Sequence, residues 1–247
     1  MKWITVVFSA ASGLLLYMNY AAHRAVVKQE QVLIHELPES FTGKTIFFIS
    51  DIHRRKISKS LSRQIAEKAD IIIIGGDLRE KGVPFSRTDY NLRLLKKEVP
   101  MLFVWGNHDM QERSIELKSL LTAHQIEILD GDIFTWKLHS SKLCIAGLNE
   151  TTGGADSRWT NAEILVSHYP STAVEAAEHA EAYFMLTGHS HGGQIRFGPW
   201  GIRPPGGWKQ AGRLTYLVSC GYGTTLLPLR FGARAEAHFI TLVSAEK

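Results

Sequence analysis

The sequence predicts an α/β fold in which two mixed β-sheets pack as a sandwich. After residue 30, short apolar runs rich in β-forming residues alternate with polar segments of helical period, the pattern of an α/β sheet protein. Predicted helices separate the early runs, which favours parallel pairing of those strands. The runs within 133–148 and 183–197 are more closely spaced, which favours antiparallel strands added to the sheets. The 247 residues suffice for one substantial core, and we expect no second globular domain.

The individual elements follow from these runs. The predicted strands are Thr45–Ser50, Ile71–Ile74, Met101–Trp105, Leu143–Leu148, Ile164–Ser167, Tyr183–Thr187, Thr215–Ser219 and Phe239–Val243. Helices are predicted at 58–69, 88–98, 112–124 and 171–180, with Ser171 or Thr172 as a cap of the last. The Gly- and Pro-rich stretch 197–207 is expected to form a long surface loop, and 151–159 either a mobile flap or an exposed turn.

The N-terminal segment differs from the rest because residues 3–22 contain no Lys, Arg, Asp or Glu. About 20 apolar residues are enough to cross a bilayer. We therefore expect residues 1–24 to be a single membrane anchor that places the protein at the cell membrane, with residues 30–247 as the functional domain. A cleaved signal peptide and a buried amphipathic helix are the alternatives. Lys2 on one side and Arg24 with Lys28 on the other leave the side of the membrane undetermined.

Charge and cysteine content exclude some classes of function. The net charge of +4 and the pI of about 9.0 suit an acidic partner, but no dense basic stripe typical of a DNA-binding protein is present, so no nucleic-acid partner is expected. Cys144 and Cys220 are the two cysteines and do not form a Cys-x-x-Cys pair. A disulfide framework and a cysteine-rich zinc site are therefore excluded.

Polar blocks that each follow a predicted strand carry the chemistry. They are residues 50–53 (SDIH), 75–77 (GGD), 106–109 (GNHD), 167–168 (SH) and 188–191 (GHSH). Loops beyond the carboxyl ends of strands in an α/β sheet converge on one crevice, so these blocks can meet. Carboxylate, imidazole and amide ligands without a thiolate suit Mn, Fe or Zn. The number of ligands predicts two cations roughly 3.5 to 4 Å apart that share a carboxylate, a centre suited to hydrolysis at phosphorus.

The ordered set D-x-H, G-D, G-N-H-D, H and G-H-x-H resembles the calcineurin-type metallophosphoesterase superfamily. The segments GHSHGGQIR (188–196) and LPLRFGARAE (227–236) are similar to its bacterial membrane-associated branch, which includes phosphodiesterases and UDP-2,3-diacylglucosamine pyrophosphatases. The likeness extends from about residue 30 to the end. It implies the four-layer α/β/β/α sandwich of metal-dependent phosphatases.

The resemblance also implies roles for individual residues. A first metal is expected on Asp51, His53, Asp77 and His191, and a second on Asp77, Asn107, His168 and His189, with Asp77 bridging the two. The implied nucleophile is a metal-bound hydroxide, because coordination lowers the pKa of water from 15.7 to about 7. His108 is the implied proton donor or charge stabiliser, and Asp109 is implied to fix the tautomer of its ring.

Cations follow the first two blocks and surround the expected metal site. We predict that Arg54 and Arg79 bind a phosphate of the substrate. The alternative is that both side chains are exposed to solvent at the rim of the site and do not contact the substrate. The Arg-Arg-Lys run at 54–56 departs from the Leu- or Gly-containing stretch that is frequent in the family, which weakens any transfer of the family's substrates to this chain.

The sequence thus predicts a dinuclear metal-dependent phosphoester hydrolase that cleaves a phosphodiester or pyrophosphate bond. A lipid-linked or nucleotide-lipid phosphate is the favoured substrate, because an anchor and a basic site mouth would both bring such a molecule to the metals. The alternatives are a broad-specificity phosphodiesterase, a protein phosphatase or nuclease of the same chemistry, and a non-catalytic metal-binding scaffold. All blocks of the motif set are present, which disfavours the scaffold.

Overall fold

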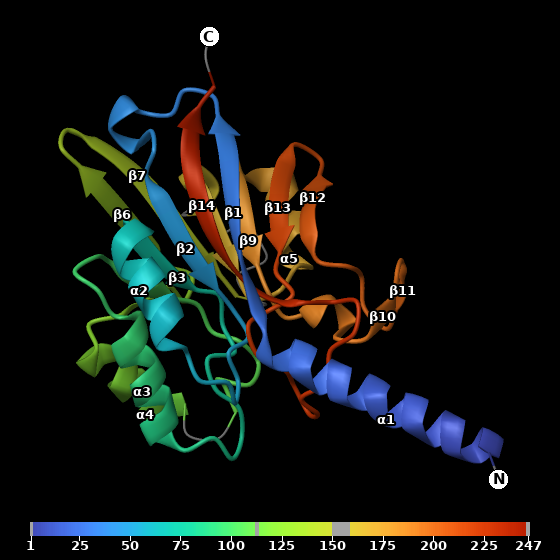
Figure 1. The fold of residues 1–247 in the computed structure, drawn as a ribbon. Helices are drawn as coiled ribbons and strands as arrows, with labels where there is room; N and C mark the ends of the chain where they lie inside the picture. The colour runs from blue at the N-terminus through green and yellow to red at the C-terminus, as the bar shows by residue number, and fades with distance from the viewer. Residues whose placement is uncertain (1, 112–113, 150–158, 246–247) are drawn as a thin grey trace.

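Two six-stranded sheets dominate the computed structural model, which describes residues 2–111, 114–149 and 159–245 (Figure 1). The first sheet has the order β1 (Ala25–Ile34), β14 (Ala235–Ser244), β2 (Thr45–Ile49), β3 (Ile71–Ile74), β4 (Met101–Phe103) and β5 (Glu127–Ile128). The second has the order β12 (Gly207–Ala211), β13 (Leu214–Val218), β9 (Phe184–Thr187), β8 (Ile164–Ser167), β7 (Ser141–Leu148) and β6 (Ile133–Leu138). A small hairpin joins β10 (Arg196–Phe197) and β11 (Trp200–Gly201).

Both sheets are mixed. In the first, β2 to β5 are parallel, and β14 runs antiparallel to β2. In the second, β7, β8, β9 and β13 are parallel, and β6 and β12 are antiparallel edge strands. The expected antiparallel pair within 133–148 is therefore present as β6 and β7. The antiparallel pairing expected within 183–197 is wrong, because β9 is parallel to both of its neighbours, β8 and β13.

Helices cover both outer faces of the sheet pair. The helices are α1 (Lys2–His23), α2 (Lys59–Lys68), α3 (Phe85–Leu95), α4 (Ser114–Ala123) and α5 (Thr172–His179). Alternate side chains of β2 point in opposite directions: Phe48 enters the core between the sheets, whereas Phe47 packs with Leu61 and Leu92 of the helices. On the other side, Met185 of β9 packs against Ala173 of α5. The four-layer α/β/β/α sandwich expected from the sequence is confirmed.

Element ends differ from the predictions in small, explicable ways. Helix α3 begins at Phe85, after Pro84 as its N-cap, and so lies three residues earlier than predicted. Ser58 caps α2 by accepting a hydrogen bond from the Leu61 N–H, whereas Ser171 makes no such bond at α5. The stretch 197–207 is exposed and contains the β10–β11 hairpin. The predicted flap at 151–159 falls almost entirely outside the described residues.

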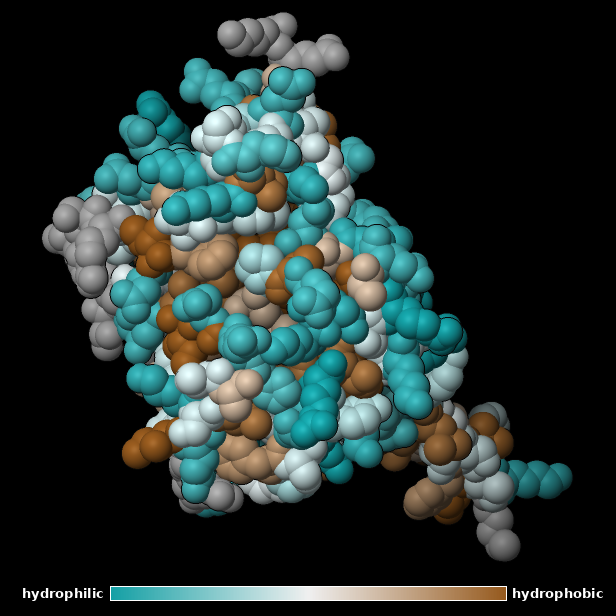
Figure 2. Space-filling view, turned by 90° about the vertical axis from the view of Figure 1, so that its left-hand side faces the viewer, coloured by the Kyte–Doolittle hydropathy of each residue, from teal (hydrophilic) through white to brown (hydrophobic). Residues whose placement is uncertain are grey.

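Helix α1 extends away from the body of the protein (Figures 1 and 2). Its apolar side chains are exposed, and in Figure 2 they protrude as brown atoms at the lower right. Only its C-terminal part is docked, where Met18 and Ala22 are buried and the Arg230 N–H donates to the Met18 carbonyl oxygen. By length and composition, α1 is able to cross a membrane.

Candidate metal centre

The polar blocks lie where parallel strands of the two sheets end. Asp51 follows β2 and Asp77 follows β3 in the first sheet, while His168 follows β8 and His189 follows β9 in the second. Because parallel strands share a carboxyl edge, and the two sheets pack face to face, these loops converge between the sheets. The fold therefore brings together side chains that are up to 140 positions apart in the chain (from 51 to 191).

Several of these residues have unusual backbone conformations. The φ angles of Asp51, His53, Asp77, His189 and His191 lie between 50° and 65°, in the left-handed region. Residues with a side chain rarely adopt this region, and each such position costs on the order of 1–3 kcal/mol. Strain of this kind persists only where the surrounding fold imposes it, and it is typical of functional sites.

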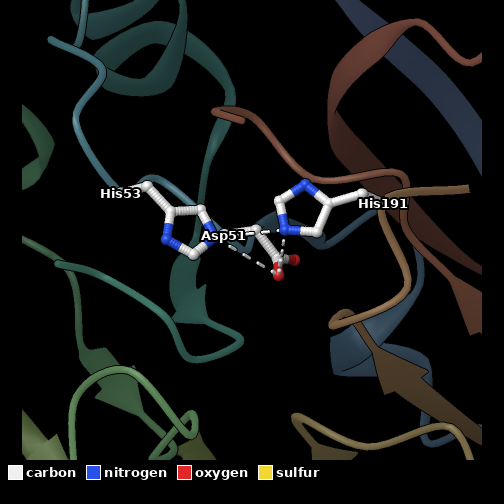
Figure 3. Close-up of side chains that lie close together, drawn as sticks. All are labelled: Asp51, His53 and His191. Carbon is white, nitrogen blue, oxygen red and sulfur yellow. Dashed lines mark hydrogen bonds and ion pairs between the residues drawn. The ribbon is translucent and has the colours of Figure 1, made fainter. Parts of the chain in front are cut away.

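One group of side chains consists of Asp51, His53 and His191, which face one another in Figure 3. The Nε2 atoms of the two imidazoles lie 3.1 Å apart. The Asp51 Oδ1 atom lies 3.2 Å from His191 Nε2 and 4.0 Å from His53 Nε2. All three residues are buried. Two nitrogens and a carboxylate oxygen thus point at a common position.

A second group adjoins the first through Asp77. Its Oδ2 atom lies 3.7 Å from His53 Nε2 and 3.4 Å from His168 Nε2. His189 Nδ1 then lies 3.2 Å from His168 Nε2 and 3.0 Å from Asn107 Oδ1. His168 Nδ1 lies 2.9 Å from the Gly75 carbonyl oxygen, a contact that orients the ring with Nε2 toward Asp77. The carboxylate of Asp77 is therefore placed between the two groups.

The electrostatics of the centre suit cations. Burial would raise the pKa of Asp51, but the charge of His191 and their hydrogen bond hold it below its ordinary value. Burial would raise the pKa of Asp77 as well, but the hydrogen bond and charge of His168 together with the charge of His53 lower it. Burial lowers the pKa of His189 and of His191, which favours the neutral imidazole that binds metals. Burial would lower the pKa of His53 and of His168 too, but the neighbouring carboxylates raise both, that of His168 to about 9. The same buried oxygens would attract a metal cation in place of these protons, and the set of carboxylate and imidazole donors fits Mn, Fe or Zn.

Glycines allow this close packing. Gly76 has a φ of +83°, and a Cβ atom there would lie 2.7 Å from His168 Nδ1. A Cβ atom on Gly188 would lie 2.6 Å from Asp51 Oδ2. Both glycines therefore leave space that the predicted ligands occupy.

The side chain of His108 lies at the centre, whereas that of Asp109 binds backbone groups of two site loops. His108 lies at the centre: its backbone N–H donates to Asp77 Oδ1 at 2.8 Å, and its ring centroid lies 5.0 Å from that of His53. Asp109 accepts hydrogen bonds from the backbone N–H groups of Leu78, Arg79 and Gly106. Its carboxylate holds two site loops together and, among the described residues, makes no hydrogen bond to the His108 ring. Burial and the charge of Asp77 raise the pKa of Asp109 to about 7.

The two arginines predicted to bind substrate differ in their exposure to solvent. Arg54 is mostly exposed and forms an ion pair with Glu80. Arg79 is buried, donates to the Val83 carbonyl oxygen at 2.9 Å and lies over the Phe85 ring. Arg79 and His108 line the same small pocket, which has a volume of about 250 Å³. Arg79 therefore borders the site, although its guanidinium is held by the protein.

Sequence reasoning missed two residues at the centre. Glu80 is buried, and its carboxylate lies 3.2 Å from His53 Nδ1. The sequence offered one indication of this role, because Glu80 lies only three residues after the candidate ligand Asp77. Arg230 is fully buried and lies 3.3 Å from His191 Nδ1, with further hydrogen bonds to backbone carbonyls. Arg230 belongs to the C-terminal segment that carried the family resemblance, but its sequence position gave no indication of a contact with His191.

Comparison with known proteins yields a family model and several relatives. The model described as calcineurin-like phosphoesterase matches residues 44–193. The chain is 38% identical over 236 residues to "Uncharacterized protein YpbG" of Bacillus subtilis (strain 168), covering 90% of this chain and 91% of that protein. It is 30% identical over 256 residues to "Uncharacterized metallophosphoesterase YkuE" of the same organism, covering 92% and 89%. "Transmembrane protein with metallophosphoesterase domain" of Danio rerio is 25% identical over 260 residues, covering 91% of this chain and 59% of that protein.

The matched interval 44–193 makes up more than half of the chain and contains every polar block of the centre. These blocks supply the oxygen and nitrogen donors that the geometry gathers at one place between the sheets. The two-sheet fold, the donor set and the family model all indicate the same family. The chain is a member of the calcineurin-like phosphoesterase family, whose enzymes are metal-dependent hydrolases.

Proposed function

We propose that this protein hydrolyses a phosphodiester or pyrophosphate bond at the centre built around Asp77. One observation carries the proposal: the Asp77 Oδ2 atom lies 3.7 Å from His53 Nε2 and 3.4 Å from His168 Nε2, so one buried carboxylate adjoins both groups of donors. Such an arrangement suits a pair of divalent cations better than one.

The residues would divide between two cations as the family resemblance implies. Asp51, His53 and His191 would hold one, Asn107, His168 and His189 the other, and Asp77 would contact both. Mn, Fe and Zn all accept this mixture of carboxylate, imidazole and amide donors. When bound, such a pair supplies Lewis acidity at the phosphoryl oxygens and an activated water nucleophile.

The chain itself would contribute proton transfer and orientation. His108 is anchored at its backbone N–H by Asp77, so its imidazole is held beside the centre and can donate a proton to the leaving oxygen. The small pocket that His108 shares with Arg79 and Lys81 is lined by cationic side chains, and it can accept an anionic part of the substrate. Asp109 keeps the two loops that carry Asp77 and His108 in place.

We further propose that α1 anchors the protein in the cell membrane and that the substrate is a lipid-linked or nucleotide-lipid phosphate. The exposed apolar surface of α1 and the name of the Danio rerio relative support the anchor. A membrane anchor would hold the site close to phosphoryl groups at the bilayer surface. A broad-specificity phosphodiesterase is the second candidate, because the centre needs only a phosphoryl group to act.

The decisive experiment is hydrolysis by full-length protein loaded with Mn²⁺. We expect turnover of bis-p-nitrophenyl phosphate, together with release of phosphate or nucleotide from a bacterial lipid extract and from UDP-2,3-diacylglucosamine. Turnover of the small ester alone would favour the broad-specificity candidate. Protein that holds two metals but hydrolyses none of these would instead support a metal-binding scaffold.

A further inference from the structure

A pocket of about 810 Å³ lies where helix α1 joins the body of the protein, and nothing in the proposed reaction uses it. Its walls come from the end of α1, the start of β1, the loop after the first polar block, helices α2 and α3, and the segment 222–228. The cationic side chains in its wall are Arg24, Arg54, Arg55, Lys56 and Arg87, and none of the described Asp and Glu residues lines it. Ser58, Ser60 and Thr224 add hydroxyl groups. The lining therefore suits a phosphate-bearing anion.

Most of these positive charges are not neutralised by the protein. Arg54 pairs with Glu80. In the described part of the chain, Arg24, Lys56 and Arg87 have no carboxylate within ion-pair distance. Arg55 donates to the carbonyl oxygens of Ala22 and Tyr222, which carry no net charge. A cluster of like charges that lacks internal counter-charges favours an external anion.

The pocket has a defined shape because Arg55 ties its walls together. The guanidinium of Arg55 also donates to the His23 carbonyl oxygen at the end of α1, and it lies 4.2 Å from the centroid of the Tyr222 ring. Arg55 is half-buried, and this burial lowers the pKa of its guanidinium. The pocket is thus assembled from α1 and the body together.

Exposed apolar side chains surround the base of α1. Leu226 lines the pocket, and its neighbour Leu227 is also exposed. On another side of the helix, the ring centroid of Phe231 lies 6.1 Å from that of Tyr17 and 4.9 Å from that of the exposed Phe197. An apolar rim beside a basic pocket is the arrangement expected at the level of lipid headgroups.

We propose that this pocket binds the phosphate headgroup of an anionic phospholipid from the membrane in which α1 is anchored. The proposal rests on the membrane anchor proposed above, but not on the substrate or on the metals. The lipid phosphate accepts hydrogen bonds from Lys56 and Arg87, and its acyl chains lie against Leu226 and α1. We assign the pocket to a lipid phosphate rather than to free phosphate, because the apolar side chains beside it would have nothing to bind if the ligand were a soluble anion.

Native mass spectrometry of full-length protein tests the proposal. The protein is released from neutral detergent micelles doped with either phosphatidylglycerol or phosphatidylcholine, and the number of retained lipids is counted. We expect one retained phosphatidylglycerol and no comparable retention of phosphatidylcholine. The double variant Lys56→Gln/Arg87→Gln should lower retention about tenfold or more. The charge-preserving variant Lys56→Arg/Arg87→Lys should restore it, which separates binding from folding.

A matched control removes two charges from the same region outside the pocket. Lys59 and Arg63 are exposed on α2 and do not line it, so Lys59→Gln/Arg63→Gln should retain the lipid. Asp77→Asn should retain it as well, because the metal centre is not involved. Equal retention by wild type and by Lys56→Gln/Arg87→Gln would overturn the proposal. Displacement of the lipid by millimolar inorganic phosphate would overturn it too, by identifying a site for free phosphate.

Discussion

The Nδ1 atom of His53 lies 3.2 Å from the Oε2 atom of Glu80, on the side of the imidazole opposite to the metal centre. A carboxylate in this position orients a metal-binding histidine and increases its basicity. The same carboxylate pairs with Arg54. Arg54, the first residue of the Arg-Arg-Lys run that departs from the family pattern, therefore has its partner three residues after Asp77.

Replacing Glu80 by Gln should weaken metal binding without abolishing it. We expect the Mn²⁺ concentration for half-maximal activity to rise about 10- to 100-fold, because an outer partner of a ligand contributes on that scale. Activity at saturating Mn²⁺ should largely recover. The exposed Glu67→Gln on α2 is the matched control. An unchanged metal dependence would show that Glu80 does not position His53.

Replacing Asp77 by Asn should remove at least one cation and abolish activity, because one neutral amide oxygen cannot serve as a shared anionic ligand. Metal content measured by elemental analysis checks this directly. Asp132→Asn changes an exposed carboxylate and should keep both metal and activity. Full metal occupancy in Asp77→Asn would contradict the bridging role.

Replacing His108 by Ala should leave the metals bound but lower the rate of hydrolysis about 100-fold or more, the usual effect of losing a general acid. The rate loss should be smaller for substrates whose leaving group is a good one, such as p-nitrophenolate. His35→Ala, at an exposed position, serves as control. If poor and good leaving groups lost the same factor, His108 would not be the proton donor.

The pH dependence of stability should reflect a buried network between β1 and β14. Burial would raise the pKa of Glu236, but the hydrogen bond and charge of His238 lower it to about 2, so its contribution exists above pH 4.5 and is lost as the pH falls toward 2. Burial would lower the pKa of His238, but Glu236 and Glu30 raise it above 6.5. The contribution of His238 is therefore complete below pH 6.5 and is lost as the pH rises through that higher pKa.

Thermal unfolding of His238→Gln against wild type measures this effect. The Tm difference between the two proteins should be largest near pH 6 and should shrink as the pH rises. A difference that stayed constant from pH 6 to pH 9 would show that the charge of His238 does not stabilise the fold.

Deleting residues 1–24 should release the protein from the membrane and leave hydrolysis of small esters intact, since no predicted ligand lies in that segment. Fractionation by ultracentrifugation together with the ester assay checks both parts. Continued sedimentation with membranes would count against the anchor and would point to the remaining exposed apolar residues.

Much of the fold could be predicted because its strands are short apolar runs followed by polar blocks. Strand β1 was missed, since a polar stretch from Lys28 to Gln31 separates its apolar ends and resembles a surface segment. Those charges are compensated from β14: Lys28 pairs with Glu236, and Glu30 with His238. Such compensation depends on a partner more than 200 positions away, which local patterns cannot reveal.

The clustering of side chains at the strand ends was also predictable, because each candidate ligand directly follows an apolar run. The surroundings of these side chains were not. The position of Asp109 beside His108 suggested a contact between their side chains, yet the Asp109 carboxylate turns to backbone N–H groups of two loops. Arg230 comes close to His191 only through the folding of the C-terminal segment. Positions of this kind depend on tertiary packing rather than on spacing along the chain.

Helix α1 ends at His23, and the first sheet begins at Ala25, so the protein has almost no slack between its apolar helix and its catalytic body. Arg55 donates hydrogen bonds to the last carbonyl oxygens of the helix. If the helix tilted in the bilayer, the whole enzyme would therefore tilt with it. At a given tilt, the height of the metal centre above the lipid would then be set by the structure. A phosphoryl group held in the bilayer would be cleaved only if it reaches that height, so distance from the bilayer surface would select among membrane-held substrates, whereas small soluble esters would reach the centre from the solvent.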